Sequence, residues 1–200
     1  MHAMIEFYFH GYGSCGEAFQ RCWPPALDGS ERFFLDGPEH DTLTSQRRWF
    51  AFTALADRIA TGVTKAANNV EQQVREALVA RWGSSDLPVI LKGHSQGAMV
   101  ALELARRNIL NVVEVHSYAG YLPPKMFDGV LGMERRALCL NLYSSTADRF
   151  VDPTAVAKTA ALFASLTGIA VRHFRSLTLP HEFSAKWLNA VNFTLAGADP

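Results

Sequence analysis

Short apolar runs alternate with longer amphipathic stretches along this chain. The short runs are rich in β-branched or aromatic residues and are bounded by Gly, Pro, Asn or Asp, which is typical of strands buried on both faces. Six such strands are predicted, at residues 4–9, 32–35, 88–92, 112–118, 137–143 and 169–174. The longer stretches carry apolar residues at helical spacing and predict helices at residues 45–61, 70–82, 96–106, 154–166 and 182–195.

This alternation predicts an α/β fold in which helices cover both faces of a mostly parallel sheet of about six strands, a three-layer sandwich. The length of 200 residues and an apolar content of 48% indicate a single domain, residues 1–200, with a substantial core. In such sheets, ligands bind outside the carboxyl ends of the strands. The loops that follow the strands are therefore where functional residues are expected.

Charge and cysteine content narrow the function classes. Lysine plus arginine and aspartate plus glutamate number 19 each, so nothing favours a nucleic-acid partner or stable association with a membrane. The three cysteines, Cys15, Cys22 and Cys139, fit neither a disulfide framework nor a zinc site. No secretion signal or bilayer-spanning stretch is apparent, so we expect a cytoplasmic protein; a homodimer is compatible with the sequence.

The loop after the strand at 88–92 holds the strongest chemical signal. It reads Gly93-His94-Ser95-Gln96-Gly97, the G-x-S-x-G pattern between a strand and a helix. Small residues two positions before and after the serine let strand and helix pass closely, and the hydroxyl is presented at the head of the helix. We predict Ser95 as a nucleophile and His94 as a packing residue; the alternative is a plain strand-to-helix turn.

Acyl transfer by such a serine needs N–H donors for the oxyanion. One expected donor is the amide of Gln96, directly after the nucleophile, and Tyr12 in the loop after the first strand is our choice for the second. Gly11 and Gly13 flank Tyr12 and allow its backbone to approach a substrate. His10 is expected to anchor this loop by hydrogen bonding.

The general base is expected late in the chain, because proteins with a G-x-S-x-G turn between a strand and a helix have the catalytic residues in the chain order nucleophile, acid, base. His116 and His173 fall within predicted strands. His181 lies in the loop after the last long strand, at the edge where the chemistry is expected. We therefore predict His181 as the base.

The acid is expected at the end of the strand that precedes this loop. Asp148 and Asp152 both qualify by position, and Asp148 lies nearer to the strand. Asp152 is well placed to cap the helix that starts at Pro153. We assign the acid to Asp148, with Asp152 as the alternative and Asp128 as a distant third.

These segments together resemble the phospholipase/carboxylesterase branch of the α/β-hydrolases, which includes acyl-protein thioesterases and small bacterial esterases. The resemblance spans nearly the whole chain and is carried by segments 93–102, 48–50, 119–123, 148–151 and 180–182. It implies the α/β-hydrolase fold and hydrolysis of a carboxylic ester or thioester through an acyl-enzyme. It implies no metal and no organic cofactor.

The residues near the expected edge suggest a shallow apolar groove for a small or medium acyl group. Trp49, Met99, Leu122 and Phe150 are the candidate substrate contacts. Residues 119–136, where larger relatives carry a lid, are too few for a cap domain, so we expect an open site. The alternatives left open are a peptidase or lipase with the same triad, and a catalytically silent binding protein on this scaffold.

Overall fold

The structure is a computed structural model that describes residues 4–26, 29–40, 46–51, 53–129 and 137–195. Within these ranges, one sheet has seven strands in the order β2-β1-β5-β6-β7-β8-β9, and β3 pairs with β4 in a separate two-stranded sheet. The elements are, in chain order, β1 (Ile5–Phe9), α1 (Gly16–Gln20), β2 (Glu31–Leu35), β3 (Glu39–His40), β4 (Arg47–Arg48), α2 (Ala56–Trp82), β5 (Val89–His94), α3 (Gln96–Arg107), β6 (Val112–Tyr118), the 3-10 helix η1 (Pro124–Phe127), β7 (Leu138–Ser145), α4 (Pro153–Ala164), β8 (Ile169–Ser176), the 3-10 helices η2 (Ala185–Leu188) and η3 (Ala190–Asn192), and β9 (Thr194–Leu195).

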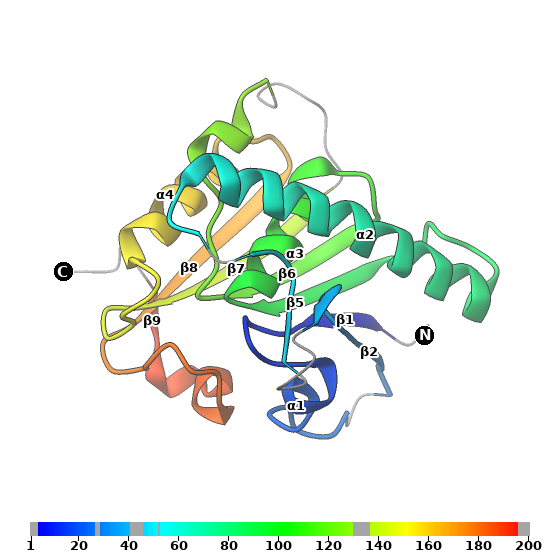
Figure 1. The fold of residues 1–200 in the computed structure, drawn as a ribbon, viewed down its shortest axis with the longest axis horizontal. Coiled ribbons are helices and arrows are strands. Elements are labelled where there is room, and N and C mark those ends of the chain that lie inside the picture. Colours follow the sequence, from blue (N-terminus) through cyan, green and yellow to red (C-terminus); the bar gives the residue numbers. More distant parts are fainter. Residues whose placement is uncertain (1–3, 27–28, 41–45, 52, 130–136, 196–200) are drawn as a thin grey trace.

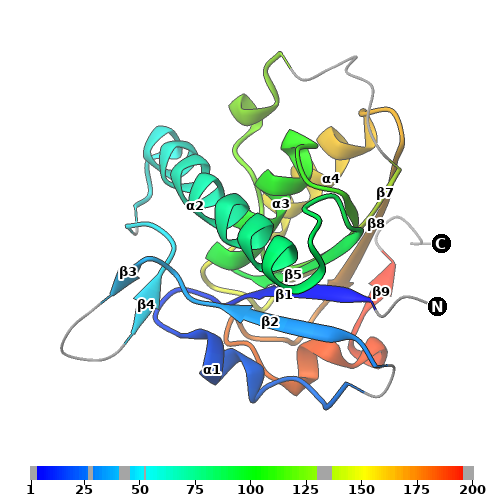
Figure 2. The ribbon, with the colours of Figure 1, turned by 90° about the vertical axis from the view of Figure 1, so that its right-hand side faces the viewer.

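The main sheet is parallel except at one edge, where β9 runs antiparallel to β8. Helices α2, α3 and α4 cover one face, and α1 with the C-terminal 3-10 helices lies against the other (Figures 1 and 2). The prediction of a three-layer α/β fold with a mostly parallel sheet is confirmed. The carboxyl ends of the parallel strands share one edge, which is where the loops predicted to carry the chemistry meet.

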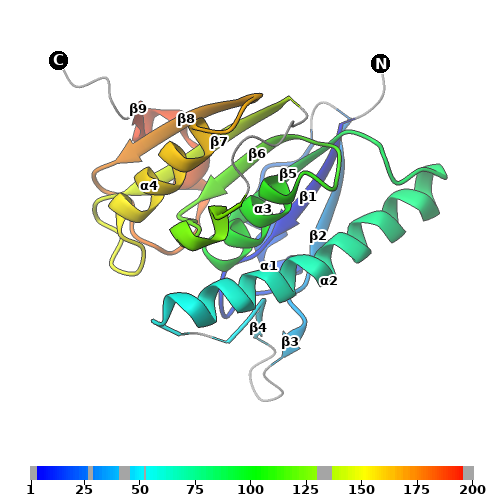
Figure 3. The same ribbon diagram turned by 90° about the horizontal axis from the view of Figure 1, so that it is seen from above.

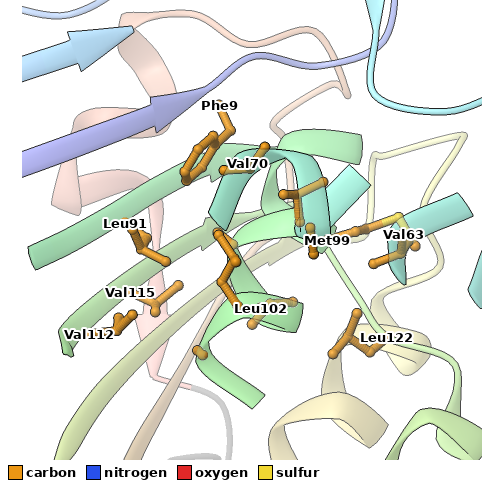
Figure 4. Close-up of a cluster of buried hydrophobic side chains, with 14 of the residues drawn as sticks. Phe9, Val63, Val70, Leu91, Met99, Leu102, Val112, Val115 and Leu122 are labelled. Atoms are coloured by element: carbon orange, nitrogen blue, oxygen red, sulfur yellow. The ribbon is translucent and has the colours of Figure 1, made fainter. Parts of the chain in front are cut away.

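The main core lies between the sheet and the three helices that cover its first face (Figure 4). Val63 and Val70 of α2 and Leu102 of α3 meet Leu91 and Val115 of the sheet in one cluster, and all five are fully buried. Removal of this apolar surface from water is the main favourable contribution to folding. The core fixes α3, and with it the turn at the head of this helix.

The predicted helices at residues 45–61 and 70–82 were wrong as separate elements. One helix, α2, runs unbroken from Ala56 to Trp82, because its buried stripe continues through Val63 and Ala67. Tertiary packing of this stripe overrides the low intrinsic helix propensity of the Thr- and Gly-containing turn. The residues before α2 include the short strand β4, whose Arg47 exchanges two backbone hydrogen bonds with the loop after β1.

The predicted helix at residues 182–195 was also wrong. This segment forms two 3-10 helices and then β9, which pairs with β8. Trp187 is buried, and its indole N–H donates to the carbonyl of Pro180 at 3.1 Å. Burial of this side chain and pairing to the sheet edge compete with a continuous helix. No helix among the described residues is both long and apolar enough to cross a membrane.

Candidate active site

Ser95 lies at a strained turn between β5 and α3. Its backbone has φ 52° and ψ −118°, a conformation that non-glycine residues rarely adopt and that is concentrated at functional sites. A Cβ at Gly93 would lie 2.5 Å from the carbonyl oxygen of Gly97, and one at Gly97 would lie 2.2 Å from that of Phe9. The two glycines of the G-x-S-x-G pattern are therefore required by close backbone contacts.

The side chains predicted as nucleophile, base and acid form one hydrogen-bonded chain. Ser95 Oγ lies 3.0 Å from His181 Nε2, and His181 Nδ1 lies 2.7 Å from Asp148 Oδ2. The three residues come from three loops, after β5, β7 and β8, that meet at the carboxyl edge of the sheet. With the proton on His181 Nδ1, Nε2 is left as an acceptor for the serine hydroxyl.

Asp148 is held as a carboxylate by hydrogen bonds on both oxygens. Its side chain is 1% exposed, and Oδ1 accepts the amides of Phe150 at 2.8 Å and Val151 at 2.9 Å. Burial acts to raise the pKa of Asp148, but the hydrogen bonds from His181 and from these two amides outweigh it, so the pKa lies below its ordinary value. The charged form is therefore favoured at neutral pH.

The alternative acids lie elsewhere. Asp152 is exposed and caps α4, where its Oδ1 accepts the amide of Thr154 at 2.7 Å. Hydrogen bonds from the side chain and the backbone of Thr154 lower the pKa of Asp152. Asp128 is an exposed residue at the end of η1. Of the three candidates, the structure brings only Asp148 to His181.

The predicted oxyanion donors lie beside Ser95. Tyr12 and Gln96 both line a cavity of about 570 Å³ that also exposes Ser95 and His181. A Cβ at Gly11 would lie 3.6 Å from the Cβ of Ser95, so the loop after β1 passes close to the serine. The loop after β1 and the first residue of α3 thus both line the cavity beside the serine, where donors to an oxyanion would be needed.

This geometry can be compared with known proteins. A family model described as Phospholipase/Carboxylesterase matches residues 2–193. The chain belongs to the phospholipase/carboxylesterase family. It is therefore a hydrolase of the esterase type with the α/β-hydrolase fold, as its sequence resemblance implied. A sequence search of curated proteins finds no match.

Solved structures share this fold over most of their length. Esterase PE8 is 19% identical, with 94% of this chain and 89% of that chain covered and a TM-score of 0.79. The carboxylesterase of Bacillus cereus is 12% identical over 95% and 86% of the two chains, with a TM-score of 0.75. Acyl-protein thioesterase 2 of Zea mays is 17% identical over 96% and 91%, with a TM-score of 0.73. At such low identity, these likenesses establish the fold and not the substrate.

The four predicted substrate contacts of this esterase-family chain separate into two pairs. Met99 and Phe150 line the cavity at Ser95, and Phe150 is 69% exposed at its wall. Trp49 and Leu122 are each 2% exposed, belong to the main core and do not line this cavity. Both side chains are buried by packing within the main core, which the sequence pattern did not indicate.

Sequence reasoning missed several apolar residues of the same cavity. They come from α1, from α2 and from the segment after β8, and include Phe19, Ile59 and Phe183. Phe183 also packs against the rings of Trp23 and His94. These residues belong to elements that the sequence placed wrongly or did not predict, so no local signal could have assigned them to the site.

The side chain of Gln96 holds the segment before α2. Its side-chain Oε1 accepts the amide of Trp49 at 3.1 Å, and its Nε2 donates to the carbonyl of Phe50 at 2.9 Å. The indole N–H of Trp49 donates to the carbonyl of His10 at 2.8 Å. The segment before α2 is thereby tied to the start of α3 and to the loop after β1.

Two buried histidines support the loops around the site. His10 accepts the amide of Gly37 on Nε2 at 2.9 Å and faces the carbonyl of Gly11 with Nδ1 at 2.7 Å, so it anchors its loop as predicted. His94 Nε2 lies 2.7 Å from the backbone carbonyl of His181, to which it donates. Burial, and next the charge of His181, lower the pKa of His94 to about 3, so its imidazole is neutral.

Proposed function

We propose that this family member hydrolyses carboxylic ester or thioester bonds of substrates with small to medium acyl groups, through an acyl-enzyme on Ser95. His181 acts as general base, and Asp148 orients it. The observation that carries this proposal is the hydrogen-bonded chain from Ser95 Oγ through His181 to the buried carboxylate of Asp148, at the wall of an apolar cavity.

In the first half-reaction, Ser95 Oγ attacks the carbonyl carbon while His181 Nε2 takes the hydroxyl proton. The Asp148 carboxylate keeps the Nδ1–H tautomer and stabilises the imidazolium that forms. The amides of Tyr12 and Gln96 donate to the oxyanion of the tetrahedral intermediate. His181 then gives its proton to the leaving oxygen or sulfur, and the acyl group remains on Ser95.

In the second half-reaction, water takes the place of the leaving group. His181 removes a proton from the water, which attacks the acyl carbonyl, and the same amides stabilise the second oxyanion. Collapse of this intermediate returns the proton to Ser95 Oγ and releases the carboxylic acid. Every proton transfer in the cycle passes through one nitrogen, His181 Nε2.

The cavity supports small and medium acyl groups. Its apolar wall includes Phe19, Met99 and Phe150, and its volume of about 570 Å³ is within the ordinary range for small-molecule sites. In the stretch at residues 119–136, the described part contains η1, and residues 130–136 lie outside the described residues. The expectation of an open site without a cap domain is part of the proposal.

The test is turnover of p-nitrophenyl butyrate together with labelling by a fluorophosphonate probe. Ser95→Ala should abolish both turnover and labelling while circular dichroism shows an intact fold. Ser14→Ala is the matched control, because Ser14 lines the same cavity and joins β4 through its backbone. This variant should keep activity and label. Label on Ser14 in place of Ser95 would overturn the assignment.

The rival functions give different results in the same assays. A silent binding protein would show a folded chain with neither turnover nor labelling. A peptidase would cleave amides at least as well as esters, and a lipase would gain activity above the critical micelle concentration of its substrate. Ester and thioester panels of matched chain length, assayed side by side, would set the preference between the two bonds.

The same proposal includes the setting in which the enzyme works. We place it in the cytoplasm as a single domain, where its three cysteines, all free in the structure, would stay reduced. Sedimentation velocity at assay concentrations decides between a monomer and a homodimer.

A further inference from the structure

A second cavity, of about 630 Å³, is lined by one face of α2, by Pro38 and Glu39, and by the segment before α2. The short strands β3 and β4 lie below α2 in the view of Figure 3. We call this second cavity the α2 cavity. One face of α2 lines it with Arg58, Thr61, Lys65 and Asn69, and the segment before the helix adds Trp49 and Phe50. The four helical residues recur at the spacing of one helix face. The volume is within the range of small-molecule sites.

The α2 cavity adjoins the cavity at Ser95. Phe50 and Thr53 line both of them. Along α2, Ile59 lines the cavity at Ser95, and its neighbour Arg58 lines the α2 cavity. One extended ligand could therefore occupy both cavities, with its reactive carbon at the serine.

The rim of the α2 cavity carries two positive charges that no described acid pairs with. Arg58 and Lys65 are exposed, and neither has an ion pair with any described residue. Among the described residues, the nearby acids are already paired: Glu39 with Arg48 at 2.7 Å, and Asp57 with Lys125, which does not line the cavity. Two cations thus face one cavity on a chain whose formal net charge is zero.

The floor of the α2 cavity is apolar. Trp49, Phe50 and Ala66 form it, and they are 2%, 6% and 2% exposed. An apolar floor below a cationic rim is complementary to a ligand with a hydrocarbon part and an anionic group. Guanidinium groups pair well with the oxygens of phosphate and carboxylate, and ammonium groups bind both as point charges.

We propose that the α2 cavity binds the anionic group, a phosphate or a carboxylate, of an amphiphilic substrate whose carbonyl carbon lies at Ser95. The position of the carbonyl rests on the proposed function, which the inference deepens by assigning the charge of the substrate. Arg58 and Lys65 select the anion, and the ring of Trp49 supports the adjacent hydrocarbon. Trp49 would then contact the substrate as predicted, from the α2 cavity and not from the cavity at Ser95.

The experiment measures binding without turnover. Octyl phosphate, octanoate and octanol are titrated by calorimetry, at low ionic strength, into the full chain carrying Ser95→Ala. Adding Arg58→Gln and Lys65→Gln should weaken both anionic probes about tenfold, as expected for two partly exposed charge pairs, and leave octanol unchanged. The matched control is Lys158→Gln with Arg172→Gln, which removes the same charge from α4 and β8, outside both cavities.

The outcomes separate the cases. A larger loss for octyl phosphate than for octanoate identifies a phosphate ligand, and the reverse identifies a carboxylate. An equal loss in the control variant, unchanged affinity in the Arg58 and Lys65 variant, or failure of both anions to bind would each overturn the proposal. Hydrolysis of p-nitrophenyl butyrate by the unmodified chain is measured separately, so failure of catalysis is distinguished from failure of the anion site.

Discussion

The buried imidazole of His94 should make the fold less stable in acid. Its ring is buried next to the active site and donates a hydrogen bond to the backbone carbonyl of His181. Burial lowers its pKa to about 3. In the unfolded chain, a histidine titrates near an ordinary pKa of about 6.5. Between these two values, the unfolded state binds one more proton than the native state does, so stability falls as the pH falls.

The size of this effect follows from the two pKa values. Each pH unit below the unfolded pKa costs up to about 1.4 kcal/mol for one proton. From about pH 7.5 to about pH 4.5, which still lies above the folded pKa of His94, the loss should reach about 2.5 kcal/mol. That is a large share of the free energy of unfolding of an ordinary domain.

The assay is urea unfolding of the unmodified chain and of His94→Gln across this pH range. Glutamine keeps an N–H donor for the carbonyl of His181 but does not titrate, so the difference between the two stability curves isolates the imidazole. The control is His40→Gln at an exposed position, which should follow the unmodified chain. Curves that stay parallel for His94→Gln and the unmodified chain would refute the reasoning.

Three further predictions concern catalysis. Asp148→Asn should lower kcat on the order of 10⁴-fold, because its amide would impose the wrong tautomer on His181, as in the chymotrypsin template. Asp152→Asn should lower kcat little, since asparagine still caps α4. The reverse ranking of the two variants in turnover would move the acid to Asp152. The value of kcat/KM should rise from acid to neutral pH, because a histidine general base acts only in its neutral form, and a profile that is flat from about pH 5 to pH 8 would contradict a histidine base. For p-nitrophenyl esters, kcat/KM should rise from the acetyl to about the hexanoyl ester and then level off, with at most about 0.8 kcal/mol of transition-state stabilisation per methylene. Phe150→Ala should make this rise smaller. A steady increase up to the palmitoyl ester would indicate a longer acyl site.

The six longer strands of the main sheet and the turn at Ser95 could be predicted because their signals are local, whereas the two-residue strands β3, β4 and β9 were not predicted. An apolar run bounded by glycine or proline specifies a buried strand within a few residues, and the G-x-S-x-G pattern occupies five consecutive residues. The contact that requires Gly93 is made within the turn, whereas the contact that requires Gly97 is made with the backbone of β1. The fold then brings His181 and Asp148 to the same edge without further information, because parallel strands end together. The sequence distinguished Asp148 from Asp152 less clearly, because both residues follow β7 within one loop.

The incorrect predictions, for two helices and for the exposure of Leu122, have a different cause. The continuous helix α2 and the non-helical C-terminal segment are decided by packing between residues far apart in sequence, such as Trp187 against the second face of the sheet. The burial of Leu122 likewise depends on α4, where Thr159 accepts its amide at 3.0 Å. A pattern read along the chain has no access to such contacts.

The segment at Trp49 and Phe50 shows what these distant contacts achieve at the site. It has no regular secondary structure, and its backbone is held by the side chain of Gln96, from 47 and 46 positions away in sequence. Because Gln96 directly follows Ser95, the turn that strains the serine also positions the wall between the two cavities. We therefore expect a substitution that removes this amide side chain to change the shape of both cavities, although the backbone N–H of residue 96 is retained. The proposed oxyanion site and the proposed anion site are in this way built on one residue, which the sequence pattern presented only as the position after a serine.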